Sequence, residues 1–425
     1  MADENIAAEQ QQNAENNSVM KLVGEKFKKY IVPELKQTVL GPMDVLRSFA
    51  KAPRSVFNFG RPDFVYLSVV LALLAFGLVV HYSASGNDLM QFEQVKYALI
   101  GIIAMLLVSC VRVSVYKKMS SFFMAVALFL MIAVLFAPVY NGTRRWIWHM
   151  QPSELGKVAL IMFFAYLIDK YRKKNHQTST FFAFLALTVF FAILIFLEVH
   201  LSGTVLFLCI GYAMMWYGDM SKKWFLGVTA LVVFAALLLV IKPEMFSPVL
   251  KDYQIQRIVI WKKILFNSEL TAKERIGDAR QVLQSIYGIG SGGAFGKGYG
   301  NSGQKINNLS EKTNDFIFAV LGEEWGFIGG LFMLALFGLL IVLGIRIAVQ
   351  SSSYYGTLLA LGISTQMAIQ VLINVAVATS LLPNTGISLP FFSEGGSSLI
   401  VTLASMGLML GVSKKDKNAK GEKNA

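Results

Sequence analysis

The sequence is short of charge, cysteine and histidine, and each shortage excludes a class of protein. Charged residues make up 15% of the 425 residues, whereas hydrophobic side chains make up 55%. Soluble domains carry about 25% charged residues, so a soluble globule is excluded. The chain has 2 cysteines and 4 histidines, with no metal-binding or paired spacing. A disulfide-rich secreted domain and a dedicated zinc site are therefore not expected.

Long apolar runs are abundant instead. Each is long enough to cross about 30 Å of hydrocarbon as a helix. The expected spans are residues 64–83, 93–112, 120–138, 153–169, 180–197, 203–218, 224–241, 315–345, 355–379 and 391–412. We therefore predict an all-α polytopic membrane protein with about ten transmembrane helices.

Basic residues in alternate connections indicate the orientation of the chain. They include "DKYRKKNH" at 169–176 and the tail "SKKDKNAKGEK". Short cytoplasmic loops carry excess Lys and Arg, so we expect both termini to be cytoplasmic. The outside segment 242–314 runs against this trend, with 11 basic and 6 acidic residues. Either an anionic ligand binds there, or a long loop is exported whatever its charge.

Three regions follow from this pattern. Residues 1–60 form an expected cytoplasmic tail, disordered over 1–19 and then basic. Its basic part either lies on the inner leaflet or is a solvated linker. Residues 61–412 form the expected membrane domain, with 242–314 as a large extracellular loop between the seventh and eighth spans. Residues 413–425 form a basic cytoplasmic tail.

The glycine run "YGIGSGGAFGKGYGNSG", 287–303, contains a formal GxGxxG. A dinucleotide site needs a strand before that motif and a helix after it, and a helical membrane protein does not supply this context. Two interpretations remain. The backbone N–H groups with Lys297 and Lys305 bind an anionic headgroup, or the run is an ordinary flexible loop.

Ionisable groups sit at the ends of several spans. In "QPSELGK", Glu154 and Lys157 are three residues apart and meet on one helix face. They form either a self-neutralising ion pair or part of a polar cavity. In "LEVHLSGT", 197–204, Glu198 and His200 need no function beyond a polar turn.

The stretch "EKTNDFIFAVLGEEWGFIGG", 311–330, holds the most unusual acids. Asp315 is either a helix N-cap or a functional group at the outer end of a span. Glu323 lies about 12 Å further down the helix and must face protein or water. Gly322, Gly326 and Gly330 predict close packing of a neighbouring helix.

The segment "LLPNTGISLPFFSEGGSSLI", 381–400, carries prolines and glycines that prevent a continuous helix. Irregular backbone at membrane depth is tolerated where it is buried in protein or lines a cavity. We therefore expect this segment to border a cavity.

Together these motifs resemble the SEDS family of bacterial cell-wall polymerases, whose members include FtsW, RodA and SpoVE. The resemblance rests on "NGTRRWIW", "QPSELGK", "GKGYGNSGQK", "TNDFIFAVLGEEWGFIG" and "LPNTGISLPFFSEGGSSLI", in family order over about residues 60 to 412. The stretch "GNSGQK" is most similar to the FtsW and SpoVE branch.

The resemblance implies a peptidoglycan glycosyltransferase that polymerises lipid II at the outer face of the bacterial plasma membrane, in division or related wall synthesis. Asp315 matches the family's aspartate and is the expected general base of an inverting transfer. Substrate-binding roles are implied for Glu154, Lys157, Arg145, Lys305, Ser397 and Ser398. No cofactor is certain, although a divalent cation, Mg or Mn, is compatible with the chemistry.

The implied partners are a class B penicillin-binding protein, which is a transpeptidase, and other divisome or elongation-complex membrane proteins; no nucleic acid is expected. Several positions depart from the family pattern, among them Ser310 before the aspartate and the short connection between "RRWIW" and "QPSE". Glu394 stands where tyrosine is usual, Val199 where proline is common, and Asn314 precedes the aspartate. Glu394 adds a second carboxylate, ligates a cation or, in the interpretation we favour, is exposed.

A lipid II flippase or another transporter is the alternative from a different class, and a non-catalytic division scaffold is a third hypothesis. A carrier should show two related halves with a site near the midplane. The sequence has no internal repeat, and its polar motifs gather at the outer boundary. Both observations favour outward-facing chemistry.

Overall fold

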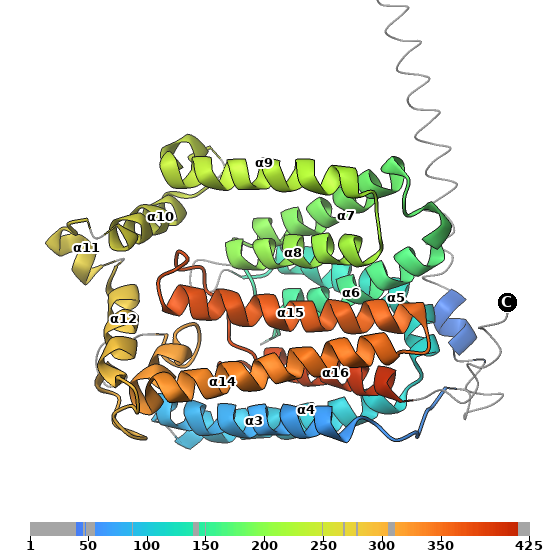
Figure 1. Ribbon diagram of the computed structural model, residues 1–425, viewed down its shortest axis with the longest axis horizontal. Coiled ribbons are helices and arrows are strands. Elements are labelled where there is room, and N and C mark those ends of the chain that lie inside the picture. The colour runs from blue at the N-terminus through green and yellow to red at the C-terminus, as the bar shows by residue number, and fades with distance from the viewer. Residues whose placement is uncertain are drawn as a thin grey trace, which may run out of the picture.

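The regular structure of the protein is helical throughout the part that the computed structural model describes. That part comprises residues 40–45, 47, 56–86, 88–138, 144–148, 150–248, 250–266, 268–277, 279–304 and 311–414. Its β-type pairing consists of two isolated bridges. The long helices lie side by side in one bundle (Figure 1). They are α3 (Phe64–Ser85), α4 (Asp88–Cys110), α5 (Val113–Val134), α6 (Pro152–Lys170), α7 (Thr178–Leu197), α8 (Leu201–Tyr217), α9 (Lys222–Ile241), α14 (Ile317–Gln350), α15 (Tyr354–Ala378) and α16 (Gly396–Ser413).

Each of these ten helices overlaps one of the ten predicted spans, with bounds that differ by up to seven residues. Eight of them, all except α6 and α8, contain segments long and apolar enough to cross a membrane. Helix α8 has 17 residues, and α6 has 19 residues but carries Glu154 and Lys157 in its first half. The chain is therefore a multi-pass, all-α membrane protein, as the apolar runs predicted.

Helix α6 lies in the interior of the bundle, where it packs against α5, α8, α15 and α16. Residues 156–162 of α6 are buried without a break, so every face of the helix meets protein over two turns. Helices α4 and α16 pack along each other, as do α7 with α8 and α14 with α15. By contrast, α9 is exposed over most of its length and lies at the edge of the bundle (Figure 1).

The segment 242–314, predicted as a loop, contains short helices of its own. They are η4 (Pro243–Phe246), α10 (Asp252–Leu265), α11 (Ala272–Ile276) and α12 (Arg280–Gly292). They gather at the end of the bundle drawn on the left of Figure 1, which we call the loop end. The predicted tails 1–60 and 413–425 lie largely outside the described residues, as does Lys305.

Two helices begin later than the sequence predicted, and both starts lie at the loop end. The N-cap of α14 is Phe316, so the N-cap prediction for Asp315 is wrong. Asp315 instead belongs to a turn in which the main-chain N–H groups of Asn314 and Phe316 donate to the carbonyl of Glu311. Helix α16 begins at Gly396 rather than near 391, because the segment before it has non-helical backbone, with φ of +68° at Phe391.

The glycine-rich run 287–303 packs onto α14 instead of presenting its N–H groups to solvent. The Lys297 N–H donates to the Glu323 carbonyl at 2.9 Å, and the Gly298 N–H donates to the Glu324 carbonyl at 3.0 Å. The ammonium of Lys297 forms an ion pair with the Glu323 carboxylate at 2.7 Å. The donors of Lys297 and Gly298 are therefore used by α14, and the headgroup-binding interpretation of this run stays untested for Lys305, which lies outside the described residues.

The glycines of α14 allow the close packing that their spacing predicted, but by two different means. Gly322 faces Ile289 of α12, and a β-carbon on Gly322 would lie 3.1 Å from that side chain. Gly326 has φ +67° and ψ −165°, which kinks α14. The turn at Ala294 fits against this kink, because a β-carbon on Gly326 would meet the Ala294 carbonyl oxygen at 2.6 Å.

The two acids of α14 hold neighbouring segments. Glu323 is buried and accepts hydrogen bonds from the Ser302 hydroxyl at 2.6 Å and from two main-chain N–H groups of residues 303–304 at 3.2 Å. Glu324 accepts one from the Ser83 hydroxyl of α3 at 2.6 Å. These bonds satisfy charges that would be costly if they were left alone in the bundle.

Candidate active site

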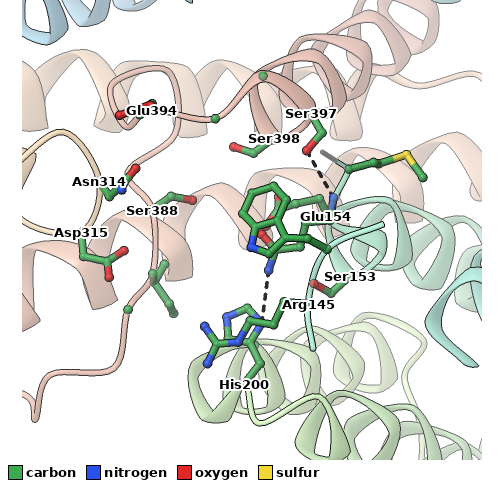
Figure 2. A pocket seen from close by; sticks show the side chains of 18 of the residues that line it. Arg145, Ser153, Glu154, His200, Asn314, Asp315, Ser388, Glu394, Ser397 and Ser398 are labelled. Atoms are coloured by element: carbon green, nitrogen blue, oxygen red, sulfur yellow. Dashed lines mark hydrogen bonds between the residues drawn. The ribbon is translucent and has the colours of Figure 1, made fainter. Parts of the chain in front are cut away.

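A cavity of about 1830 Å³ opens at the loop end of the bundle. Its walls come from α4, the connection 145–151, α6, α8, α10, the turn 311–315, α15, the irregular segment 384–388 and the start of α16. Figure 2 shows the polar side chains of these segments directed toward a common space. The prediction that segment 381–400 borders a cavity is confirmed. Of the described candidate residues, Arg145, Glu154, Lys157, Asp315, Ser397 and Ser398 all line it.

Asp315 is fixed in the cavity wall by main-chain contacts. The Asn374 side-chain amide of α15 donates to the Asp315 carbonyl at 3.0 Å and to the Ile387 carbonyl at 2.6 Å. Gly386 has φ +69°, and a β-carbon there would lie 3.0 Å from Asp315 Oδ2. Glycine is therefore required both by the backbone conformation and by the nearness of the carboxylate.

The charges around Asp315 act in opposite directions on its pKa. Burial raises the pKa, and the neighbouring carboxylate of Glu311 raises it further, while Arg145 and Arg257 lower it. The net result is a pKa of about 6. At neutral pH the group is ionised but more basic than an ordinary aspartate, which suits a general base.

Arg145 reaches the cavity from the connection before α6. Its guanidinium donates to the carbonyl of Val199, a residue held at φ +62°, in the turn between α7 and α8. Burial lowers the Arg145 pKa, while the nearby acids Asp315 and Glu198 act to raise it. Burial also raises the pKa of Glu198 to about 8. Arg145 therefore remains cationic beside one ionised and one mostly neutral acid.

Glu154 and Lys157 satisfy both interpretations of their spacing, because they form an ion pair and line the cavity. Their closest N–O distance is 2.8 Å, and both side chains are buried. Lys157 also donates to the side chain of Gln370 on α15 at 3.4 Å, and Gln370 in turn donates to the Ser388 carbonyl at 3.0 Å. The pair thus connects α6 to the irregular segment that carries Gly386.

The first turn of α16 closes the cavity opposite Asp315 (Figure 2). The Gln151 N–H donates to the Ser397 hydroxyl at 3.4 Å, and Ser398 lies beside it on the wall. Glu394, just before this turn, is half-buried and accepts a hydrogen bond from Thr313, so the interpretation of an exposed Glu394 is wrong.

Several residues of the cavity wall were not predicted from the sequence. Arg257 and Tyr253 come from α10, within the segment predicted as a loop, and Gln370 comes from the middle of an apolar helix. The signal for Arg257 was available in "YQIQRIVIWKKIL", where apolar residues recur at helical spacing. His200, interpreted as part of a polar turn, also lines the cavity, and burial lowers its pKa, so it is neutral.

The acids of the cavity do not form a metal cage. Glu311 already accepts a hydrogen bond from Asn314 at 2.9 Å, and Glu394 accepts one from Thr313 at 2.7 Å. Across the ranges that the structure describes, no three His, Cys, Asp or Glu side chains group to hold an ion. A Mg or Mn ion in this cavity would need ligands beyond these carboxylates, such as phosphate groups of a substrate.

Comparison with known proteins places these features in a family. A family model described as a cell cycle protein, FtsW/RodA/SpoVE, matches residues 64–418. Stage V sporulation protein E of Bacillus subtilis (strain 168) is 37% identical over 372 residues, covering 83% of this chain and 97% of that protein. A probable peptidoglycan glycosyltransferase FtsW of Geobacter sp. (strain M18) is 37% identical over 382 residues, covering 84% and 98%.

Solved structures share the fold. One, titled "Structural coordination of polymerization and crosslinking by a peptidoglycan synthase complex", superposes with a TM-score of 0.69 at 28% identity, over 83% of this chain and 97% of that chain. The crystal structure of the rod shape determining protein RodA of Thermus thermophilus superposes with a TM-score of 0.60 at 24% identity, over 83% and 96%.

Proposed function

This chain belongs to the FtsW/RodA/SpoVE family of cell cycle proteins, and on that premise we propose that it is a peptidoglycan glycosyltransferase that polymerises lipid II with Asp315 as general base. Its relatives include proteins named as probable peptidoglycan glycosyltransferases, of which it spans nearly the full length. The observation that carries the assignment of the base is the position of Asp315 in the wall of the large cavity, with its pKa raised to about 6.

The reaction joins two lipid-linked disaccharides. The 4-hydroxyl of the acceptor GlcNAc attacks the anomeric carbon of the donor sugar, and its proton passes to Asp315. The bond from that carbon to the pyrophosphate oxygen breaks, and undecaprenyl pyrophosphate leaves with the electron pair. One carboxylate base and a stabilised leaving group are sufficient for such an inverting displacement.

The leaving group needs positive charge, and the cavity supplies it. Arg145, Lys157 and Arg257 all line the wall. The first turn of α16, with Ser397 and Ser398, adds main-chain N–H groups and hydroxyls. Because Lys157 is already paired with Glu154, we assign the pyrophosphate chiefly to the two arginines. Glu154 then keeps Lys157 in place as a hydrogen-bond donor for the sugar.

The proposal places the loop end of the bundle at the outer face of the bacterial plasma membrane, with both termini inside. Support comes from the basic connections at the opposite end, where η3 (Arg172–Lys174) joins α6 to α7. A class B transpeptidase is the proposed partner, because a structural neighbour comes from a synthase complex that couples polymerisation with crosslinking.

The decisive experiment is polymerisation of labelled lipid II by the purified protein, with and without its transpeptidase. Wild type should yield glycan polymer, and Asp315→Ala should lose at least about 100-fold, which is the usual contribution of a general base. Asp315→Asn is the isosteric comparison and should be equally inactive. Equal polymer from wild type and both variants would remove Asp315 as the base.

A vesicle assay addresses the transporter alternative, which family membership does not favour. Lipid II movement across the bilayer without polymer formation would contradict the proposal. Polymer formation that does not require lipid II to cross the bilayer would support the proposed glycosyltransferase function.

A further inference from the structure

Two residues far apart in the sequence, Thr313 and Glu394, are joined by a pair of hydrogen bonds. The Thr313 hydroxyl donates to Glu394 Oε2 at 2.7 Å. In return, the Glu394 main-chain N–H donates to the Thr313 carbonyl at 2.7 Å. Thr313 is buried and Glu394 is half-buried, so competition from water is reduced at this contact.

A second link lies beside this pair. The Ser393 hydroxyl donates to the Asn314 carbonyl at 2.7 Å and accepts from the Leu389 N–H at the same distance. The Asn374 side-chain amide also donates a hydrogen bond to the Asp315 carbonyl. Residues 313, 314 and 315 are therefore each hydrogen-bonded to a neighbouring segment. Figure 2 shows Glu394, Asn314 and Asp315 on the same side of the cavity.

We propose that Glu394 is a positioning residue, which holds the turn carrying Asp315 against the segment 388–395 through its carboxylate on Thr313. The inference rests on the proposed role of Asp315. The turn precedes α14, which begins at Ile317, and its own main-chain hydrogen bonds run from Asn314 and Phe316 to the Glu311 carbonyl. Contacts from outside the turn therefore help to set the direction of the base. A carboxylate is a stronger acceptor than a neutral group at this contact. Small displacements of a catalytic group are costly, since about 1 Å can lower a rate 100-fold.

The test compares Glu394→Ala, Glu394→Gln, Thr313→Val and the double variant Thr313→Val with Glu394→Ala. Glu394→Ala should lower kcat by about 10- to 100-fold and change KM for lipid II by less than about twofold. Glu394→Gln should retain most activity, because its amide oxygen still accepts from Thr313. The double variant should be no worse than the poorer single variant, since both remove one contact. Glu269→Gln, at an exposed position between α10 and α11, is the control.

Hydrogen exchange supplies a readout that does not depend on activity. Glu394→Ala and Thr313→Val should both accelerate exchange of the amides in 311–316 while leaving α6 protected. Thr313→Val is nearly isosteric and removes the same hydrogen bond, so it tests the inference if Glu394→Ala does not fold.

Three results would overturn the inference. They are wild-type kcat in Glu394→Ala, a loss in Glu394→Gln as deep as that in Glu394→Ala, and unchanged exchange of 311–316. Absence of polymer from wild type would count against the proposed function instead. The exchange experiment would still test whether the Thr313–Glu394 contact holds the turn.

Discussion

At the scale of single residues, the proposed chemistry depends on how the protein sets the basicity of Asp315. Burial and the Glu311 carboxylate favour the protonated form, whereas Arg145 and Arg257 favour the ionised form. The same two arginines are the proposed binding groups for the leaving pyrophosphate. A bound pyrophosphate would neutralise them and thereby make Asp315 more basic once the substrate is in place.

The pH dependence of polymerisation follows from this balance. A base works in its deprotonated form, so kcat/KM should rise with pH, reach half of its plateau near pH 6 and level off above that. Glu311→Gln removes a like charge and should move this rise to lower pH. Arg257→Gln removes an opposite charge and should move it to higher pH, with weaker lipid II binding as well. Initial rates from about pH 4.5 to 8 measure both shifts. A rise that stays in place in both variants would exclude Asp315 as the titrating group.

Gly386 provides a second test at the residue scale, because it combines a positive φ with nearness to the base. Gly386→Ala should cost about 1–2 kcal/mol of stability through its left-handed backbone and should also displace the Asp315 carboxylate. Gly86→Ala, at the end of α3, has φ +58° with open space around it. It should show the same loss of stability without loss of activity. Thermal unfolding in detergent and polymerisation rates separate the two effects. Equal activity in both variants would mean that Gly386 does not determine the position of the base.

At the scale of elements, the kink of α14 at Gly326 makes room for the turn at Ala294, which follows α12, while the rest of the long helix runs through the bundle. Gly326→Ala should lower the unfolding midpoint by the equivalent of at least about 2 kcal/mol, since φ +67° and the Ala294 carbonyl both oppose a β-carbon. Gly338→Ala, in the regular part of α14 with open space around it, should instead raise stability by about 0.5–1 kcal/mol. Calorimetry of the two variants is the measurement. Stabilisation by both would show that the kink imposes no strain on a larger residue.

Elements whose sequence carries its own periodicity or apolar length were predictable, and those fixed by distant partners were not. The ten long helices follow from the apolar runs, because only a helix satisfies the backbone inside a membrane. The helix α10 was missed because its basic residues made the whole segment resemble a loop. Glu394 was misjudged because its partner, Thr313, lies 81 residues away in the sequence. The sequence motifs cover the connection before α6, the starts of α6 and α8, the turn before α14 and the segment before α16. They miss the walls that come from α4, α10 and α15, and they do not show which side chains meet.

At the scale of the whole molecule, the site is formed where the two halves of the chain meet. Helix α6 and the connection before it supply Arg145 and the Glu154–Lys157 pair, while the turn before α14 and the start of α16 supply Asp315 and the serines. Because α6 is enclosed by α5, α8, α15 and α16, its charged pair is held in protein instead of lipid. The long helices therefore act as a support, and the irregular segments at the loop end carry the proposed reactive groups.

The proposed function depends on the orientation of the whole molecule, because it requires the substrate's sugars to reach the cavity from outside. Cys110 and Cys209 are free and half-buried in helices, so replacing both by Ala leaves a background for single-cysteine labelling. Glu269→Cys, at the loop end, and Lys173→Cys, between α6 and α7, are both at exposed positions. In intact spheroplasts a membrane-impermeant maleimide should label the cysteine at 269 alone, and the one at 173 should react only after permeabilisation. The reverse pattern would place the cavity on the cytoplasmic side, where a polymerase could not extend an external glycan strand.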